Sequence, residues 1–325
     1  MGSRLAARSD QGSPVTLIKR LRRVAKEAAG ESDVRIEEQL KELNHRMTRL
    51  EEAIADLKPN IKMLPSIVRK LYLDDVELPP PYDLLSQRFR YRSQNEEDGL
   101  LLALFKRIRT TDRRCVEIGC GSNGGNSGFL VQECGWTGLM VDANRSKISI
   151  VKVRYAGHPV TVVKHRVTSD DVNSLMAAHG FVGELDFLSI DIDGIDFWVW
   201  EALTACTPRV VALEYNWLFG PDRAVTVPND PDFRVGAQGT RSYRGASLMA
   251  LVHLGQRKGY RLVATERVNA IFVRDDVAPE IPAIDVARGF RAPKEAKDAQ
   301  DVFGKIERAG LPLVTVTSTG VTKPL

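Results

Sequence analysis

The spacing of hydrophobic positions divides the chain into a helical N-terminal part and a longer part in which strands and helices alternate. Over residues 15–29 apolar residues share one face of a predicted helix, and lysine and arginine crowd the remainder. Over residues 33–58 charged residues surround an apolar series with alternating spacings of four and three, which predicts a short coiled coil and a homo-oligomer. The series consists of Ile36, Leu40, Leu43, Met47, Leu50, Ile54 and Leu57.

Each of these N-terminal patterns has an alternative interpretation. The stretch 33–58 also fits one amphipathic helix packed on the rest of the chain. The basic helix at 15–29 is of the kind that lies on an anionic membrane surface, or it is a solvated helix packed on its own protein. Residues 1–14, rich in Gly, Ser and Arg, are expected to be disordered. We therefore assign residues 15–78 to a helical, coiled-coil extension.

From about residue 94 apolar strands alternate with helices. These strands are apolar on both faces, as buried parallel strands are, so residues 79–277 predict an α/β domain with a doubly wound, Rossmann-like sheet. The predicted strands are 115–121, 138–144, 160–166, 185–194 and 209–216, and the predicted helices are 127–135, 147–157, 171–180, 197–206 and 246–260.

The end of this domain predicts a change of strand direction. Only a few residues separate RLVATE (261–266) from AIFVRDD (270–276), so the two strands should form an antiparallel hairpin. Such a hairpin is typical of the methyltransferase version of this fold, and most NAD-binding Rossmann domains lack it. Residues 278–325 form a C-terminal extension with one helix predicted near 294–309.

Composition narrows the class of protein. Hydrophobic residues make up 43% and charged residues 27% of the chain, as in ordinary globular proteins, and a net charge of +4 is too small to indicate a nucleic-acid partner. The sequence shows neither a long apolar run nor a signal peptide. A cytoplasmic protein is expected, with peripheral contact at the inner membrane surface as an option.

A glycine-rich segment follows the first predicted strand. Gly119, Gly121 and Gly124 satisfy GxGxxG, a pattern that NAD, FAD and S-adenosylmethionine (SAM) sites share. Glu117 within the strand and Asp142 at the end of the next strand favour SAM, because Asp142 can accept hydrogen bonds from ribose hydroxyls. The alternatives are that Glu117 caps a neighbouring loop and that Asp142 is an ordinary strand-end residue. By position, His165, Arg166 and Val167 are candidates for an adenine pocket.

Acidic residues gather where the fourth and fifth strands end. Asp191 and Asp193 follow one strand and Glu214 ends its neighbour, so their side chains should share one site. Such oxygen ligands suit Mg²⁺ or Mn²⁺, which would activate a hydroxyl. Without a metal, Asp193 or His165 is the candidate general base. The alternative is that Asp193 and Asp196 cap the following helix and that Asp191 only touches the cofactor.

The segment 217–245 is long for a connection and predicts a functional lid. Its aromatic residues are candidates for stacking on a sugar ring, or they pack beneath the loop: Trp217, Phe219, Phe233 and Tyr243. Arg241 and Arg244 are candidates for holding a phosphate or carboxylate group.

Several segments carry a family resemblance: SQNEEDG (93–99), VEIGCG (116–121), SIDIDGIDFWVWEAL (189–203) and LEYN (213–216). Together with Asp142 they resemble the FkbM-like and neighbouring sugar O-methyltransferases, over a little more than half of the chain. The coiled coil lies outside this likeness, and the loop SNGGN has more glycine and asparagine than is usual in the family.

The resemblance implies methyl transfer from SAM to a hydroxyl of a saccharide, glycolipid or glycosylated natural product. Gln94 and Glu97 would close over the cofactor, and Asp191, Asp193 and Glu214 would line the acceptor or metal site. The candidate cofactor-binding residues are Gln94, Glu117, Gly119, Gly121, Asn126, Asp142 and Asp191. The candidate catalytic residues are Asp193, His165 and Asp191, and the candidate substrate-binding residues are Asn216, Tyr243, Arg241 and Arg244.

Two other functions compete with this one. An NAD-dependent oxidoreductase acting on a nucleotide sugar would use the same glycines, but no Tyr-x-x-x-Lys pair follows the fourth strand. A non-catalytic module with this fold would assemble a complex through its coiled coil. The retained Glu117, Asp142 and Asp191 argue against such a loss of activity.

Overall fold

The computed structural model describes residues 18–24, 39–48, 64–65, 67–69, 78–290 and 299–322. It comprises two units, Met1–Val68 and Arg69–Leu325, which are described separately. In the first unit residues 18–24 and 39–48 are helical, as predicted. The other residues of the predicted coiled coil, and the predicted disorder of 1–14, lie outside the described residues. Self-association of the chain stays a prediction.

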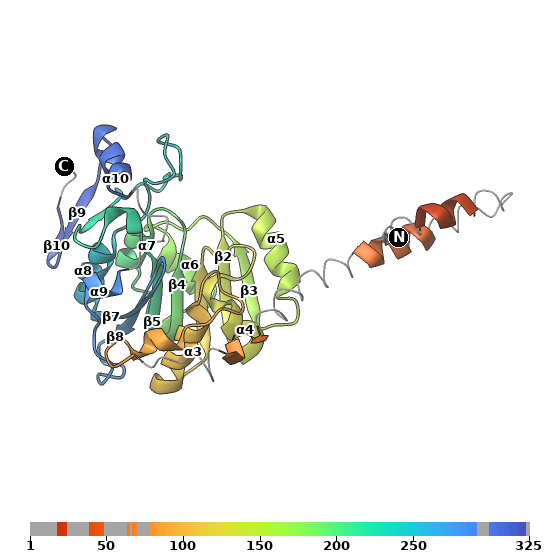
Figure 1. The fold of residues 1–325 in the computed structure, drawn as a ribbon, viewed down its shortest axis with the longest axis horizontal. Coiled ribbons are helices and arrows are strands. Elements are labelled where there is room, and N and C mark those ends of the chain that lie inside the picture. Colours follow the sequence, from red (N-terminus) through yellow and green to blue (C-terminus); the bar gives the residue numbers. More distant parts are fainter. Residues whose placement is uncertain are drawn as a thin grey trace, which may run out of the picture. The chain divides into compact units, whose positions relative to one another are not determined.

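The second unit is built on a seven-stranded sheet with the order β3-β2-β1-β4-β5-β8-β7 (Figure 1). Strands β1 to β5 are parallel to one another, and β8 runs antiparallel to both β5 and β7. The predicted doubly wound sheet with an antiparallel hairpin is confirmed. The strands are β1 Arg114–Ile118, β2 Thr137–Asp142, β3 Val160–Lys164, β4 Gly183–Ile190, β5 Cys206–Glu214, β7 Tyr260–Glu266 and β8 Asn269–Arg274.

Alternate residues of each strand feed two hydrophobic cores, one on each face of the sheet. In β1 the side chains of Val116 and Ile118 enter one core, and Cys115 enters the other. The first core is covered by α6 Val172–Ala178, α7 Asp196–Ala202 and α8 Leu248–Lys258, and the second by α3 Glu97–Ile108, α4 Gly128–Cys134 and α5 Arg145–Arg154. Short helical turns occur at η1 Asp83–Gln87, η2 Gly125–Ser127, η3 Trp217–Phe219 and α9 Val286–Gly289.

A second, three-stranded sheet joins the segment 217–245 to the C-terminal residues. Its order is β10-β9-β6, formed by β6 Val225–Thr226, β9 Val314–Thr317 and β10 Gly320–Val321. The predicted C-terminal helix is α10 Ala299–Arg308, and residues 291–298 lie outside the described part. Phe303 of α10 packs edge-on against Phe219, with ring centroids 6.0 Å apart. The segment predicted as a lid is thus partly built into a sheet with residues 299–322.

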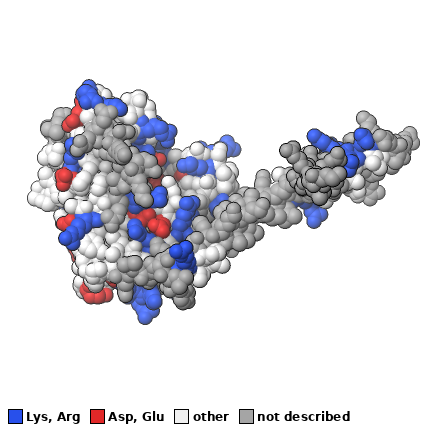
Figure 2. All heavy atoms as spheres, in the orientation of Figure 1, with Lys and Arg blue, Asp and Glu red and all other residues white. Residues whose placement is uncertain are grey.

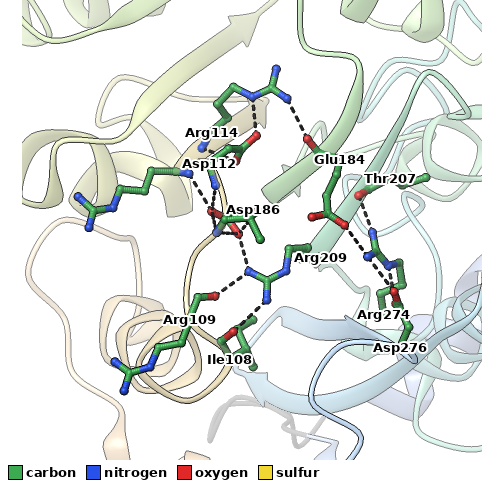
Figure 3. Close-up of polar contacts among 12 residues, drawn as sticks. Ile108, Arg109, Asp112, Arg114, Glu184, Asp186, Thr207, Arg209, Arg274 and Asp276 are labelled. Atoms are coloured by element: carbon green, nitrogen blue, oxygen red, sulfur yellow. Dashed lines mark hydrogen bonds and ion pairs between the residues drawn. The ribbon is translucent and has the colours of Figure 1, made fainter.

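At the amino ends of the strands a buried ion pair ties the layers together (Figure 3). Arg209 of β5 donates to Asp186 of β4 at 2.7 Å, and the two side chains are 9% and 0% exposed. Arg209 also donates to the carbonyls of Ile108 and Arg109, where α3 ends. Asp186 accepts further bonds from the amides of residues 111–113, which lead into β1. This network fixes α3 and the start of β1 on the sheet.

Candidate active site

A pocket opens at the carboxyl ends of β1, β2 and β4. Strand order reverses between β1 and β4, which is where doubly wound sheets bind ligands. Its polar rim comes from Asp142, His165 and Arg166, and Val167 lines it as well, while the assignment of these residues to adenine stays a prediction. The whole lining is Ile118, Gly119, Val141, Asp142, Ala143, His165, Arg166, Val167, Ile192, Gly194, Ile195 and Phe233.

Gly119 forms the turn out of β1 and requires the absence of a side chain. Its φ of 93° lies in the left-handed region. A Cβ there would lie 1.7 Å from the carbonyl oxygen of Asp191, which leaves β4 beside it. The Gly119 amide donates to the Val141 carbonyl at 2.8 Å, so the turn is held against β2 as well. Gly119 therefore brings three strand ends together around the pocket.

Asp142 holds the rest of the glycine loop at the pocket wall. Its Oδ2 accepts from the Gly121 amide at 3.0 Å, and its Oδ1 accepts from the Asn144 amide at 2.7 Å. The carboxylate is buried yet lines the pocket. Lys147 on α5 lies 3.8 Å from Oδ2. Backbone amides thus fix the orientation of an acceptor group beside the cavity.

Glu117 lies behind the glycine loop and does not line the pocket. Its Oε2 accepts from the Ser127 amide at 2.8 Å and from the Ser127 hydroxyl at 2.6 Å, at the amino end of α4. A Cβ on Gly125 would lie 2.0 Å from Oε1, so the loop passes directly over this carboxyl group. Glu117 thus fits the alternative in which it caps a neighbouring loop: its side chain points to the α4 side of the sheet and supports the loop from below. Its assignment to cofactor binding stays a prediction.

Burial raises the pKa of Glu117 to about 7, although hydrogen bonds from Ser127 and Ser189 act in the opposite direction. The folded chain therefore keeps a proton that the unfolded chain, with the ordinary value of 4.5, has released. The free energy of unfolding should fall by about 3 kcal/mol as pH rises from 4.5 to 7.

Glu117→Gln is expected to remove this pH-dependent part of the free energy of unfolding. The urea midpoint of the variant should therefore vary less with pH. The matched control is Glu133→Gln on the same helix layer, where the glutamate pairs with Arg92 near the surface. If the plot of urea midpoint against pH has the same slope in Glu117→Gln as in wild type, the assigned protonation is wrong.

Three carboxyl groups meet beside the pocket. Oxygens of Asp191, Asp193 and Glu214 lie within 4.8 Å of one another, as predicted from the strand ends. Burial, and then the neighbouring carboxylates of Asp196 and Asp193, raise the pKa of Asp191 to about 7. Burial and Asp191 raise the pKa of Glu214 well above 4.5. This acidic trio therefore holds a proton near neutral pH.

Arg244 provides positive charge to the acidic trio. Its Nε lies 3.2 Å from Asp193, and one terminal nitrogen lies 3.4 Å from Glu214. Asn216 holds this loop in place, because its amide group donates to the carbonyls of Ser242 and Arg244. The Asn216 oxygen accepts from Leu218, so its polar atoms are used by the backbone. Its assignment to substrate binding is corrected to support of Arg244.

Asp196 is the first residue of α7 and does not cap it, contrary to the alternative given above; it holds the preceding turn instead. Its two oxygens accept from the amides of Ile192 and Gly194, at 2.7 and 2.8 Å. These bonds shape the turn from which Asp193 projects with a positive φ of 56°. Asp196 thus positions the acidic trio without being one of its members.

The aromatic residues of the segment 217–245 mostly pack beneath it. Phe219, Phe233 and Tyr243 are buried. The Tyr243 hydroxyl donates to the Pro312 carbonyl at 2.5 Å, so its assignment to substrate binding is corrected. Phe233 reaches the pocket wall, and Trp217 is half-buried. Arg241 is exposed and lies outside the pocket lining.

The remaining candidate site residues differ in exposure and in their hydrogen-bond partners. Asn126 is buried and donates to the Ser189 hydroxyl, whereas Gln94 is exposed. Glu97 is buried and accepts from Asn95 and Asn269, so it joins residues 93–97 to the β7–β8 turn. His165 pairs through Nε2 with Asp171 at 2.8 Å. That nitrogen is therefore engaged at the edge of the pocket.

Sequence reasoning missed part of the pocket wall. Ile192, Gly194 and Ile195 line it and were not named, and Phe233, named only as a candidate for stacking on a sugar ring, lines it too. The first three follow the predicted fourth strand, so their position could have been inferred from the switch-point rule. Phe233 comes from an irregular segment, and its position depends on contacts with Gly194 and Tyr243 that no local pattern specifies.

Comparisons with known proteins give weak likenesses. No family model matches the chain, and no curated protein matches it. The N-terminal domain of EvdMO1, solved with SAH bound, matches 56% of this chain and 81% of its own at 12% identity and a TM-score of 0.36. The methyltransferase domain of bacterial CtHen1-C matches 55% of this chain and 97% of its own, at 13% identity and a TM-score of 0.36.

A third solved structure is the T. thermophilus 16S rRNA N2 G1207 methyltransferase RsmC in complex with AdoMet and guanosine. It matches 57% of this chain and 45% of its own at 13% identity and a TM-score of 0.33. Identities and TM-scores this low leave the function to be argued from the chain's own residues.

Proposed function

We propose that this protein transfers a methyl group from SAM to a hydroxyl group of a saccharide-containing acceptor. The observation that carries the choice of SAM is the contact between Glu117 and the amino end of α4. A dinucleotide fold places its pyrophosphate at the amino end of this helix, where free amides receive it. Here the Ser127 amide already donates to the Glu117 carboxyl group, and Gly125 lies directly on that group. A pyrophosphate would find this amide occupied instead of free.

The pocket fits the nucleoside part of SAM. Val167, Ile195 and Phe233 offer apolar surface for an adenine ring. Asp142 is oriented by two backbone amides and can accept bonds from ribose hydroxyls at the same wall. SAM supplies a methyl group on a positively charged sulfur when it is bound. The carboxyl groups of the acidic trio would favour that charge beside them.

The acidic trio supports proton removal from the acceptor. A general base works best when its pKa lies near the working pH, and burial raises the pKa of Asp191 to about 7. Asp193 is the most accessible member, at 47% exposure, and Arg244 orients it. We propose that Asp191 and Asp193 together take the hydroxyl proton, while the loop around Arg244 holds the acceptor in line with the methyl group. His165, engaged with Asp171, would position the nucleoside.

The saccharide acceptor rests on the resemblance of segments 93–99, 189–203 and 213–216 to sugar O-methyltransferases. A turnover screen with SAM against oligosaccharides, glycolipids and non-sugar alcohols tests it. Methylation of sugar hydroxyls alone is the expected result, and transfer only to non-sugar acceptors would refute this part of the proposal.

Calorimetry with S-adenosylhomocysteine, SAM and NAD⁺ tests the choice of cofactor. Binding of the two sulfur nucleosides at micromolar concentration is expected, with no heat from NAD⁺. Asp142→Asn should weaken nucleoside binding at least tenfold, because it removes a charged acceptor for the ribose. Asp170→Asn is the control, an exposed carboxylate outside the pocket lining, and should change binding much less. Preferential binding of NAD⁺ would refute the proposal.

Binding of a divalent cation to the acidic trio would also fit its oxygen ligands. The position of Arg244 suggests how to test for it. A cation bound to these carboxylates would have to displace the guanidinium from Asp193 and Glu214. We therefore expect EDTA to leave turnover unchanged, and Mn²⁺ binding to become measurable only in Arg244→Met. Arg241→Met is the matched control on the same loop. Turnover that EDTA abolishes and Mg²⁺ restores would instead establish a resident metal.

A further inference from the structure

The helix at residues 18–24 has two chemically distinct faces. At about 100° per residue, Ile18, Leu21 and Val24 occupy an arc of about 120°. Lys19, Arg20, Arg22 and Arg23 occupy the remainder, and the helix contains no acidic residue. The seven residues therefore combine one apolar face with four positive charges.

The basic face of this helix and two of its three apolar residues are accessible. Leu21 is 45% exposed and Val24 is 61% exposed, whereas Ile18 is buried. All four basic residues are exposed, and Lys and Arg side chains of this unit are visible on the surface in Figure 2. Exposing two large aliphatic side chains beside a dense cationic surface is unfavourable in water and favourable at the boundary between lipid headgroups and acyl chains.

We propose that the helix at residues 18–24 docks on an anionic lipid surface, with Leu21 and Val24 inserted below the headgroups and the basic residues against them. The charge indicates an anionic surface, because each lysine or arginine near such a membrane strengthens binding about fivefold. The exposed aliphatic residues favour lipid over nucleic acid, which needs only the cations. None of the helices in the described ranges has the length and apolar character of a membrane span. The inference does not depend on methyl transfer.

Co-sedimentation of the full-length protein with vesicles tests the proposal. One vesicle set is phosphatidylcholine alone, and the other contains about 30% phosphatidylglycerol. Wild type is expected to sediment with the anionic vesicles only, and less so as salt increases. Arg20→Glu/Arg22→Glu should lower binding at least tenfold. Leu21→Ser/Val24→Ser, which keeps every charge, should lower it severalfold.

The matched control is Lys41→Glu/Arg46→Glu, an equal change of charge on the exposed surface of helix 39–48 in the same unit. It should bind nearly as wild type does. Three results would each overturn the proposal: no sedimentation of wild type, equal loss in the control, or unchanged binding after Leu21→Ser/Val24→Ser. The last would indicate a general polyanion-binding surface, such as one for nucleic acid.

Discussion

Gly119→Ala is expected to abolish binding of S-adenosylhomocysteine, with a loss of at least a hundredfold. The new Cβ would lie 1.7 Å from the carbonyl oxygen and 2.6 Å from the carbonyl carbon of Asp191. Both atoms belong to the backbone, so β1 and β4 must separate to make room. That separation would displace the turn that carries Asp191 and widen the pocket. Calorimetry measures the loss, and circular dichroism shows whether the sheet persists.

Gly157→Ala is the control for backbone strain. Gly157 has a φ of 86°, close to that of Gly119, but nothing lies within 4 Å of the position that its Cβ would take. It should cost about 1–2 kcal/mol of stability and leave nucleoside binding unchanged. If Gly119→Ala behaves like Gly157→Ala, the close approach of β1 and β4 does not shape the pocket.

Arg209→Met should lower the free energy of unfolding by about 3–5 kcal/mol, because it leaves Asp186 charged, buried and without its main partner. The carbonyls that end α3 lose their donors in the same step. For a unit of this size the thermal midpoint should fall by about 10 °C. Differential scanning calorimetry measures the change, and nucleoside binding well below the midpoint should persist.

Arg274→Met provides the comparison on the neighbouring strand (Figure 3). Arg274 pairs with Glu184 and Asp276, whose side chains are 45% and 66% exposed. An exposed pair of this kind contributes at most about 1 kcal/mol. Equal losses of unfolding free energy in the two variants would show that burial does not strengthen the pair of Arg209 and Asp186.

The pH dependence of stability offers an independent check on the pair of Arg209 and Asp186. Burial alone would raise the pKa of Asp186, but bonds from Arg209 and from the amides of residues 111–113 outweigh it and lower the pKa below 3.8. The stabilisation is therefore complete above pH 4 and is lost as pH falls further. The deficit of Arg209→Met should shrink in strongly acidic solution. A deficit that is constant with pH would contradict the assigned charge.

The main sheet was predictable because its signals are local. Each buried parallel strand is a continuous apolar run, and each run is followed by a helix or a turn residue. The short gap between β7 and β8 also fixes their antiparallel pairing. The second sheet gave no such signal. Strand β6 has two residues, and its partner β9 lies near the end of the chain, so only tertiary contacts select the pairing.

The candidate site was predictable where strand ends converge and unpredictable where side-chain direction matters. The acidic trio follows from the adjacency of β4 and β5. Glu117 was placed in the pocket because sequence gives its position along β1 but does not give its partner Ser127, which ends η2 and draws the carboxyl group away. Tyr243 and Asn216 were assigned to substrate binding for a similar reason, because sequence does not give their hydrogen-bond partners. The Tyr243 hydroxyl bonds to Pro312, and the Asn216 amide bonds to Ser242 and Arg244. Each of these partners is more than 20 residues away along the chain.

The pairing of β6 with β9 makes catalysis vulnerable to damage far from the pocket. The segment that supplies Phe233 and Arg244 is anchored by this pairing and by the bond from Tyr243 to Pro312. Residues 299–322 also add Phe303, Ile306 and Val316 to the first hydrophobic core. Proteolytic cleavage between the main sheet and this segment should therefore lower the thermal midpoint and release the loop that carries Phe233 and Arg244 in one step.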